Sequence, residues 1–372
     1  FSDYGRPSMS KAAELAALIG SGQAQGNKNL IINGAMTIDE RHDGSSFTVV
    51  NGNSRTGYIA DRFRINESSG AEFTAQRVED APVGFKYSSK ITVSTADTSL
   101  GSTEFSRVIQ PIEGQNISHL GWGTSDAKTL TLTFYVKSSV TGQYYISVFN
   151  NAADRTLLKG YTIDSADTWE KKTITIIGDQ SGTWLTTNAV GIHLMWSLGT
   201  GSNYQSSTLD AYQAGFYMAK SDQVNFAASV SSTWQLTGVQ LEVGEVATAF
   251  EHEDVTTTLS KCQRYFYSHT NGDTKTICNA NAYATTMVFG TIHFPTSMRT
   301  SSYTLHYTTG TNYFRFYRAG ANTDFDDWTG INERTEAGIT IYKSSLSGFT
   351  AGHAGWLLSI NASAHVYFDA EL

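Results

Sequence analysis

Apolar residues recur at every second position over much of the chain, which is the pattern of β-strands that bury one face. The stretch TLTLTFYVKSS, residues 129–139, shows it most clearly. One face of this stretch carries Leu130, Leu132, Phe134 and Val136, and the other carries the threonines, Tyr135 and Lys137. Shorter stretches of the same kind are separated by turn-rich segments. The pattern predicts many antiparallel strands in a sandwich or jelly roll.

The alternation slips once, at Thr237 and Gly238. The apolar residues hold one phase before the slip and the opposite phase after it: Trp234 and Leu236, then Val239, Leu241 and Val243. A β-bulge at the slip would keep both halves facing the core, and glycine is the residue that such a bulge tolerates best.

The chain has 372 residues, more than one hydrophobic core usually serves, so two domains are expected. Residues 244–261, GEVATAFEHEDVTTTLSK, lose the alternation and turn polar, which predicts a strap with Val246 and Phe250 as its anchors. The first domain is expected to end near residue 254. The predicted divisions are a helix and linker at 1–28, a jelly-roll-like sandwich at 29–254 and a C-terminal sandwich at 255–372.

The final stretch, WLLSINASAHVYFDAEL, alternates over its whole length. Its predicted core face is Trp356, Leu358, Ile360, Ala362, Ala364, Val366, Phe368, Ala370 and Leu372. Strands rarely run so far unbroken, so a bend is expected around residues 361–364, where the side chains are small.

The segment SMSKAAELAALIG near the N-terminus predicts a short helix. Ser10 can cap its start, Leu15, Leu18 and Ile19 share a face, and Gly20 stands where a C-terminal cap belongs. A helix of this length is marginal alone. Either its apolar face packs on symmetry mates in an oligomer, or the segment is a frayed arm.

The composition excludes some classes of partner. The formal net charge is -8, only 16% of residues are charged, and no basic cluster exceeds Lys171 and Lys172. Nucleic-acid binding is therefore not expected. No apolar run is long enough to span a bilayer, so membrane insertion is not expected either. The two cysteines, Cys262 and Cys278, form one disulfide or remain as two buried thiols, and two thiols is the favoured interpretation.

Several stretches resemble bacteriophage tail fibres and related virion appendage proteins. They are KNLIINGAMTIDERHDG at 28–44, DRF at 61–63, TLTFYVKSS, the block WQLTGVQLEVGEVATAFEHEDVTTTLSKCQRYFYSH at 234–269, and the ending FDAEL. The resemblance covers nearly all of the chain from residue 28, and the block 234–269 is its specific part. At Phe63 the chain departs from the DRW motif of many relatives.

The resemblance implies a carbohydrate-binding-module-like jelly roll, a homotrimer, and attachment to other virion proteins through the N-terminal segment. It implies recognition of a host cell-surface glycan or receptor, assembly in the bacterial cytoplasm with Cys262 and Cys278 as thiols, and a final location on the extracellular virion. One alternative is a purely structural fibre or connector, such as a head fibre. A third interpretation is a polysaccharide depolymerase.

The sequence carries no phosphate-binding, zinc-protease or nucleophile-elbow motif, so no enzyme, cofactor or metal is expected. Two acidic clusters offer the carboxylate types of a glycosidase pair. They are Asp39, Glu40 and Asp43, and Asp324, Asp326 and Asp327. Structural roles are favoured for the first cluster and solvated hairpin carboxylates for the second. Residues 251–254, EHED, carry metal-ligand types without a second ligand group.

Aromatic side chains give the better candidate for a ligand site, because planar rings stack on sugar faces. In NYFRFYRAG, burial of Phe314 and Phe316 would leave a Tyr–Arg–Tyr face available. The predicted ligand-binding residues are Tyr313, Arg315, Tyr317, Asp326, Trp328 and the loop residue Trp122. The alternative for this face is a subunit interface or an ordinary outer sheet face.

Overall fold

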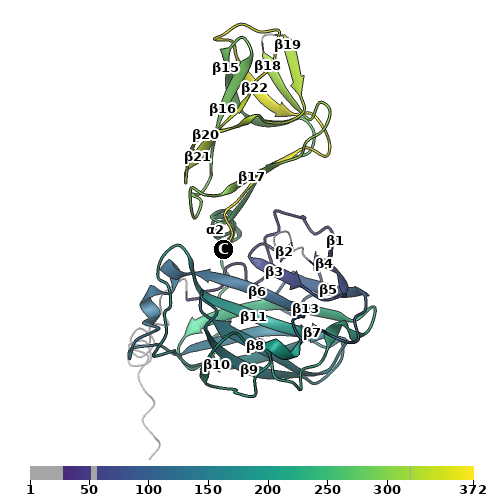
Figure 1. Ribbon diagram of the computed structural model, residues 1–372, viewed down its shortest axis with the longest axis vertical. Helices are drawn as coiled ribbons and strands as arrows, with labels where there is room; N and C mark the ends of the chain where they lie inside the picture. Colours follow the sequence, from purple (N-terminus) through teal and green to yellow (C-terminus); the bar gives the residue numbers. More distant parts are fainter. Residues whose placement is uncertain (1–27, 52–56, 319) are drawn as a thin grey trace, which may run out of the picture.

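The computed structural model describes residues 28–51, 57–318 and 320–372. Two β-rich regions lie end to end, with the C-terminal one at the top of Figure 1. The described residues contain a single α-helix, α2 (Val255–Gln263), among antiparallel sheets, so the predicted all-β class is confirmed. The helix predicted at residues 10–19 lies outside the described residues.

The first region is a sandwich of two antiparallel sheets. The six-stranded sheet has the order β1 (Phe47–Val49), β4 (Glu72–Val78), β5 (Ser88–Thr95), β13 (Thr233–Val243), β7 (Leu130–Ser138), β10 (Glu170–Ile176). The seven-stranded sheet has the order β12 (Tyr212–Ala214), β9 (Arg155–Ile163), β8 (Gly142–Phe149), β11 (Val190–Thr200), β6 (Phe105–Glu113), β3 (Phe63–Glu67), β2 (Tyr58–Ala60). Buried side chains from both sheets, between Ile31 and Leu241, form its core.

The strand β7 buries the predicted face, namely Leu130, Leu132, Phe134 and Val136. Its opposite face is not fully exposed, because Thr131 and Thr133 are buried as well. The Thr131 hydroxyl donates a hydrogen bond to the carbonyl oxygen of Gly244 at 2.7 Å. The polar strap that follows β13 therefore covers part of the outer face of this sheet.

The phase slip in β13 is a bulge at the predicted place. The register of β13 against β7 shifts between Thr237 and Gln240, and Gly238 has φ of 61°. A Cβ atom at Gly238 would lie 2.8 Å from the rings of Phe85 and Tyr135. The left-handed backbone and the close packing both require glycine here.

The strap is anchored at one of the two predicted positions. Phe250 is half-buried and packs edge-on against Phe85, with 4.8 Å between ring centroids. The prediction for Val246 is wrong, since this side chain is 70% exposed. Val243, predicted in the core, is also exposed. The strap is held instead by polar contacts described below.

The strap is shorter than predicted, because residues 255–261 belong to the helix α2 instead. The Asp254 carboxylate caps it by accepting hydrogen bonds from the amides of Thr256 and Thr257, at 2.8 and 3.4 Å. Its buried residues are Thr258, Cys262 and Gln263, so no apolar stripe signals it in the sequence. No helix among the described residues is long and apolar enough to cross a membrane. Cys262 and Cys278 are free and buried, as predicted.

The second region also has two antiparallel sheets. The smaller sheet has the order β14 (Phe266–Asn271), β23 (His365–Asp369), β17 (Thr304–Tyr307). The larger has the order β19 (Ala321–Phe325), β18 (Phe314–Arg318), β22 (Ala354–Ser359), β15 (Lys275–Ala284), β16 (Met287–His293), β21 (Gly338–Lys343), β20 (Gly330–Thr335). A second buried cluster, between Ile277 and Ala370, belongs to this region. The predicted domain boundaries at residues 28 and 254 stay predictions.

The C-terminal stretch bends as predicted, because β22 ends at Ser359 and β23 begins at His365. After the bend, the predicted residues Ala364, Val366, Phe368 and Ala370 are buried. Before the bend the phase is opposite to the prediction, since Leu357 is buried and Trp356 is exposed. The bend changes which set of alternate positions faces the core, whereas the sequence pattern predicted the same set on both sides of it.

Charged side chains join the two regions. In the first region, Arg41 and Arg62 both pair with Glu371, the Arg41 contact being 3.2 Å. From the second region, Arg264 makes a bidentate contact to Glu113, at 2.7 and 2.9 Å. The side chains of Arg62, Glu113 and Glu371 are almost fully buried. The relative placement of the regions thus depends on buried charge pairs.

Candidate functional site

The aromatic face predicted around β18 is present on the outer side of the larger sheet of the second region. Phe314 and Phe316 are fully buried, and Arg315 and Tyr317 alternate with them on the opposite face. Tyr313 precedes β18 and packs partly buried against the core of this region, so the expectation that it joins the outer face is wrong. Figure 1 shows β18 and β19 at the end of the molecule that lies away from the first region. The part of the predicted face that is present, Arg315 and Tyr317, therefore lies near the far end of the molecule.

Trp356 lies directly across from Tyr317 in the register of β18 with β22. The ring planes are 3° from parallel and the centroids are 5.7 Å apart. Tyr317 is 37% exposed and Trp356 is 50% exposed, so both rings offer apolar surface to solvent. Asn279 pairs with Trp356 on the next strand, β15. Two aromatic rings and an amide thus follow one another across three strands.

A shallow groove of about 620 Å³ opens beside these two rings. Its wall includes Asn279, Arg318 and Gly320 besides Tyr317 and Trp356. The Arg318 guanidinium is buried and donates to the Thr323 hydroxyl and the Gly348 carbonyl. The groove therefore offers ring surface and the Asn279 amide, a mixture that suits polyhydroxylated ligands.

Arg315 is fixed beside this groove by Asp324 on β19. Its Nε and Nη2 atoms donate hydrogen bonds to the two carboxylate oxygens, at 2.6 and 2.8 Å. This bidentate pair holds the guanidinium at a defined height on the sheet face. Arg315 therefore contributes a positioned charge, and both oxygens of the Asp324 carboxylate are engaged in this pair.

A second group of rings continues the outer face on the far side of β15. Phe289 on β16 lies between Tyr283 and Tyr342, with ring centroids 5.1 and 5.3 Å away. Tyr283 is 71% exposed. Asn281 pairs with Phe289 in the register of β15 with β16. The outer face thus carries two aromatic groups with the asparagines of β15 between them.

Asp326 and Trp328 do not join this face. The Asp326 carboxylate accepts a hydrogen bond from the Asn312 amide at 2.8 Å, which closes an exposed turn. Trp328 is only 3% exposed and packs against Phe314 and Phe325, with centroids 5.2 and 5.0 Å away. The expectation of an accessible ring at Trp328 is wrong, because the loop folds it into the core.

Trp122 is also a core residue. It is 7% exposed, meets Trp184 edge-on with centroids 4.7 Å apart, and donates its indole hydrogen to the Lys128 carbonyl at 2.8 Å. The expectation of an exposed ring at a loop tip is therefore wrong. Trp356 takes the place of these two tryptophans on the exposed surface, and only the structure reveals it.

The two acidic clusters hold local structure. The Asp39 carboxylate accepts hydrogen bonds from the amides of His42 and Gly44, at 3.1 and 2.8 Å, as expected for a structural role. Asp327 pairs with Lys343 at 2.5 Å. No group of three or more metal-ligating side chains occurs in residues 28–51, 57–318 and 320–372.

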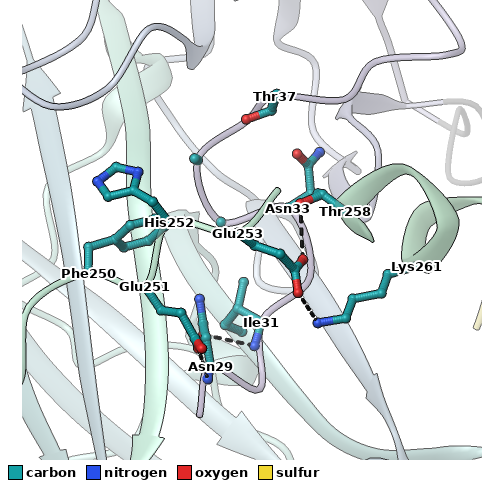
Figure 2. A pocket seen from close by; sticks show the side chains of 12 residues that line it. Asn29, Ile31, Asn33, Thr37, Phe250, Glu251, His252, Glu253, Thr258 and Lys261 are labelled. Atoms are coloured by element: carbon teal, nitrogen blue, oxygen red, sulfur yellow. Dashed lines mark hydrogen bonds and ion pairs between the residues drawn. The ribbon is translucent and has the colours of Figure 1, made fainter. Parts of the chain in front are cut away.

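The strap encloses a small pocket of about 70 Å³, drawn in Figure 2. Its charged groups bond to one another and to the chain. The Glu251 carboxylate accepts a hydrogen bond from the Asn29 amide at 3.0 Å, and Glu253 accepts one from the Thr258 hydroxyl at 3.0 Å and pairs with Lys261. These contacts explain the polar segment EHED, whose role is to fasten the strap.

No family model matches the chain, and no curated protein sequence matches it significantly. Among solved structures, the enzymatically active domain of tailspike protein 4 of bacteriophage CBA120 is similar, at 12% identity and a TM-score of 0.30, over 52% of this chain and 21% of that chain. A CBM4 structure is similar at 15% identity and a TM-score of 0.30, over 57% of this chain and 98% of that chain.

A third similar structure is TmCBM61 in complex with β-1,4-galactotriose. It has 10% identity and a TM-score of 0.29, over 59% of this chain and 100% of that chain. Similarities at these identities and TM-scores assign neither a family nor a ligand. The function is therefore inferred from the residues of the chain itself.

Proposed function

We propose that this protein is a non-catalytic binding protein whose second region binds glycan on the outer face of its larger sheet. The observation that carries the proposal is the exposed pair of parallel rings, Tyr317 and Trp356, with Asn279 beside them. A pyranose ring has an apolar face for stacking and equatorial hydroxyls for hydrogen bonding. An aromatic pair flanked by amides offers both kinds of contact.

The composition of the face favours a sugar over a second copy of the chain. The cores of protein interfaces are depleted in charged residues. Here the rings lie beside the Arg315–Asp324 pair and the exposed amides of Asn279 and Asn281. Amides that alternate with rings suit a sugar, because each sugar unit has an apolar face and polar hydroxyls close together.

We extend the proposal to host attachment by a fibre-type virion protein, on the strength of the sequence resemblance. In a homotrimer, three equivalent faces would raise the avidity for a surface coat well above that of one site, provided their spacing matches the target. Attachment to other virion proteins through the N-terminal segment, and assembly in the bacterial cytoplasm, belong to the same proposal.

The test is binding of the full chain to a glycan array and to intact host cells. Trp356→Ala and Tyr317→Ala should each weaken binding about tenfold or more, since each removes a stacking surface. Trp169→Ala is the matched control, because this half-buried tryptophan belongs to the first region. Wild-type affinity in both of the first two variants would refute the proposal.

A structural role as a fibre or connector is the second candidate, and the same exposed rings favour it as a face between subunits. Sedimentation equilibrium of Trp356→Ala separates the two. An unchanged mass with lost glycan binding supports a sugar site, whereas dissociation of an oligomer supports an interface. A depolymerase would release reducing ends from host polysaccharide, and we expect none, because Asp324 and Asp327 are held in ion pairs.

A further inference from the structure

A cavity of about 410 Å³ lies where the two sandwiches meet, between β2 and β3 of the first and β17 of the second. Arg64 and Tyr58 line it from the first sandwich. Arg299, Ser302 and Thr304 line it from the second. The side chains of all five can donate hydrogen bonds.

Neither arginine of this cavity forms an ion pair with a described carboxylate, although the charge of Glu113 acts on Arg299. No hydrogen bond or ion pair joins the Arg64 guanidinium to another described residue, and its Nε is buried. The Arg299 side chain donates only to backbone carbonyl oxygens, those of Asn188 and Ala370 at 2.7 Å and of Glu371 at 3.2 Å. A partly buried guanidinium without a counter-charge is unfavourable, because burial removes water that is not replaced by an anion.

Two acids, Asp369 and Glu371, also line the cavity, and both lie near other arginines. Glu371 pairs with Arg41 at 3.2 Å and with Arg62. Asp369 lies 3.7 Å from Arg41. Neither Arg41 nor Arg62 lines the cavity. Neither acid forms an ion pair with Arg64, which is the arginine of the cavity that lacks a carboxylate partner among the described residues.

The charge of Arg64 acts on two buried basic groups, His193 and Arg107. Burial together with the charges of Arg107 and Arg64 lowers the pKa of His193 to about 3. Burial and the charge of Arg64 lower the pKa of Arg107 to about 10. Arg107 itself lies over the rings of Phe105 and Phe216 and forms no ion pair with a described residue. The region would be stabilised by a bound negative charge.

We propose that this cavity binds a small anion, a carboxylate, sulfate or phosphate, with Arg64 as its main ligand. Guanidinium groups bind these anions through paired hydrogen bonds. Arg299 adds charge, and the hydroxyls of Ser302 and Thr304 add donors. The buried Tyr58 hydroxyl, which has no partner among the described residues, stands at the same wall. The anion site is separate from the aromatic face, so a test that refutes one proposal leaves the other standing.

The test is thermal unfolding of the full chain with increasing sodium sulfate, phosphate or glucuronate. Glucose and sodium chloride at matched ionic strength are the reference additions. A ligand that binds only the folded state raises the Tm in a saturable way. We expect this for the three anions and for neither reference. A greater effect of glucuronate would identify the anion as part of an acidic sugar, and a greater effect of sulfate or phosphate as an inorganic ion.

Variants locate the site. Arg64→Gln should weaken anion binding about tenfold, and Arg64→Lys should retain part of it. Lys86→Gln is the matched control, because it removes one positive charge at an exposed position that lines neither this cavity nor the aromatic face. Ser302→Asp, at an exposed position of the cavity wall, should abolish binding by placing a negative charge there, and it tests the site even if Arg64→Gln does not fold. Unchanged affinity in Ser302→Asp, or no saturable effect of any anion on the wild type, would overturn the proposal.

Discussion

The two sandwiches use aromatic side chains differently, because only the first covers the outer face of its seven-stranded sheet. In that sandwich, Phe149 and Met195 on the outer face are packed under Tyr204, Phe216 and Met218 from a following segment. The strand β11 is therefore buried along almost its whole length. In the second sandwich, β15 alternates between exposed and buried positions.

This difference shows that a ring is available to a ligand only where no other segment packs over its sheet face, whatever the residue type. Trp122 and Trp196 are buried in the first sandwich, while Tyr283 and Trp356 are exposed in the second. A strand that is buried on both faces marks a covered sheet. A strictly alternating strand marks an open face, on which exposed rings become candidates for binding.

The largest predicted effect contrasts one tryptophan from each sandwich. Trp196→Ala should lower the free energy of unfolding by about 3–5 kcal/mol, because its ring is fully buried against Phe134. Trp356→Ala should lower it by about 1 kcal/mol or less, since the ring is half exposed. Urea unfolding followed by circular dichroism measures both. Equal losses would break the comparison between covered and open faces.

A slightly smaller effect is expected at the junction. Glu371→Gln leaves the buried Arg62 guanidinium without its carboxylate, which should cost about 3 kcal/mol. Glu245→Gln, at an exposed position, is the matched control and should change stability by less than about 0.5 kcal/mol. Unfolding is followed by tryptophan fluorescence. A single transition that splits into two in Glu371→Gln would show that the buried charges couple the sandwiches.

The smallest effect concerns the bulge of the first sandwich. Gly238→Ala should cost about 2 kcal/mol, because its left-handed backbone and its 2.8 Å approach to Phe85 and Tyr135 both disfavour a Cβ atom. Gly84→Ala shares the positive φ but meets nothing within 4 Å. Its cost, measured in the same urea titration, should be smaller. A Gly84→Ala cost equal to that of Gly238→Ala would show that packing adds nothing.

Sequence reasoning predicted the parts of the fold that depend on local alternation. The buried face of β7, the bulge at Gly238 and the outward placement of Tyr317 all follow from period-two patterns with an unambiguous phase. The site could be predicted only in part, because Trp356 precedes a bend and its phase cannot be counted back from Phe368 across that bend. Burial of Trp122 and Trp328 depends on how loops fold over, which alternation does not record.

The charge pairs that join the two regions could not be predicted from the sequence, for a different reason. These pairs join residues that are hundreds of positions apart, such as Arg62 with Glu371. From sequence alone a charged residue is expected at the surface, because burial of a charge is costly unless a partner of opposite charge is present. The partner is supplied only by the tertiary fold. The helix α2 was not predicted, because a polar helix has no apolar stripe in its sequence.

The pairing of β14 with β23 has a consequence for the newly made chain. β23 is the middle strand of its sheet and contacts both β14 and β17, yet it is translated after both of them. Until then, β14 and β17 lack the strand that joins them. A ribosome-bound chain arrested before residue 365 should therefore expose these edges to protease, even after every residue of the first sandwich has been translated.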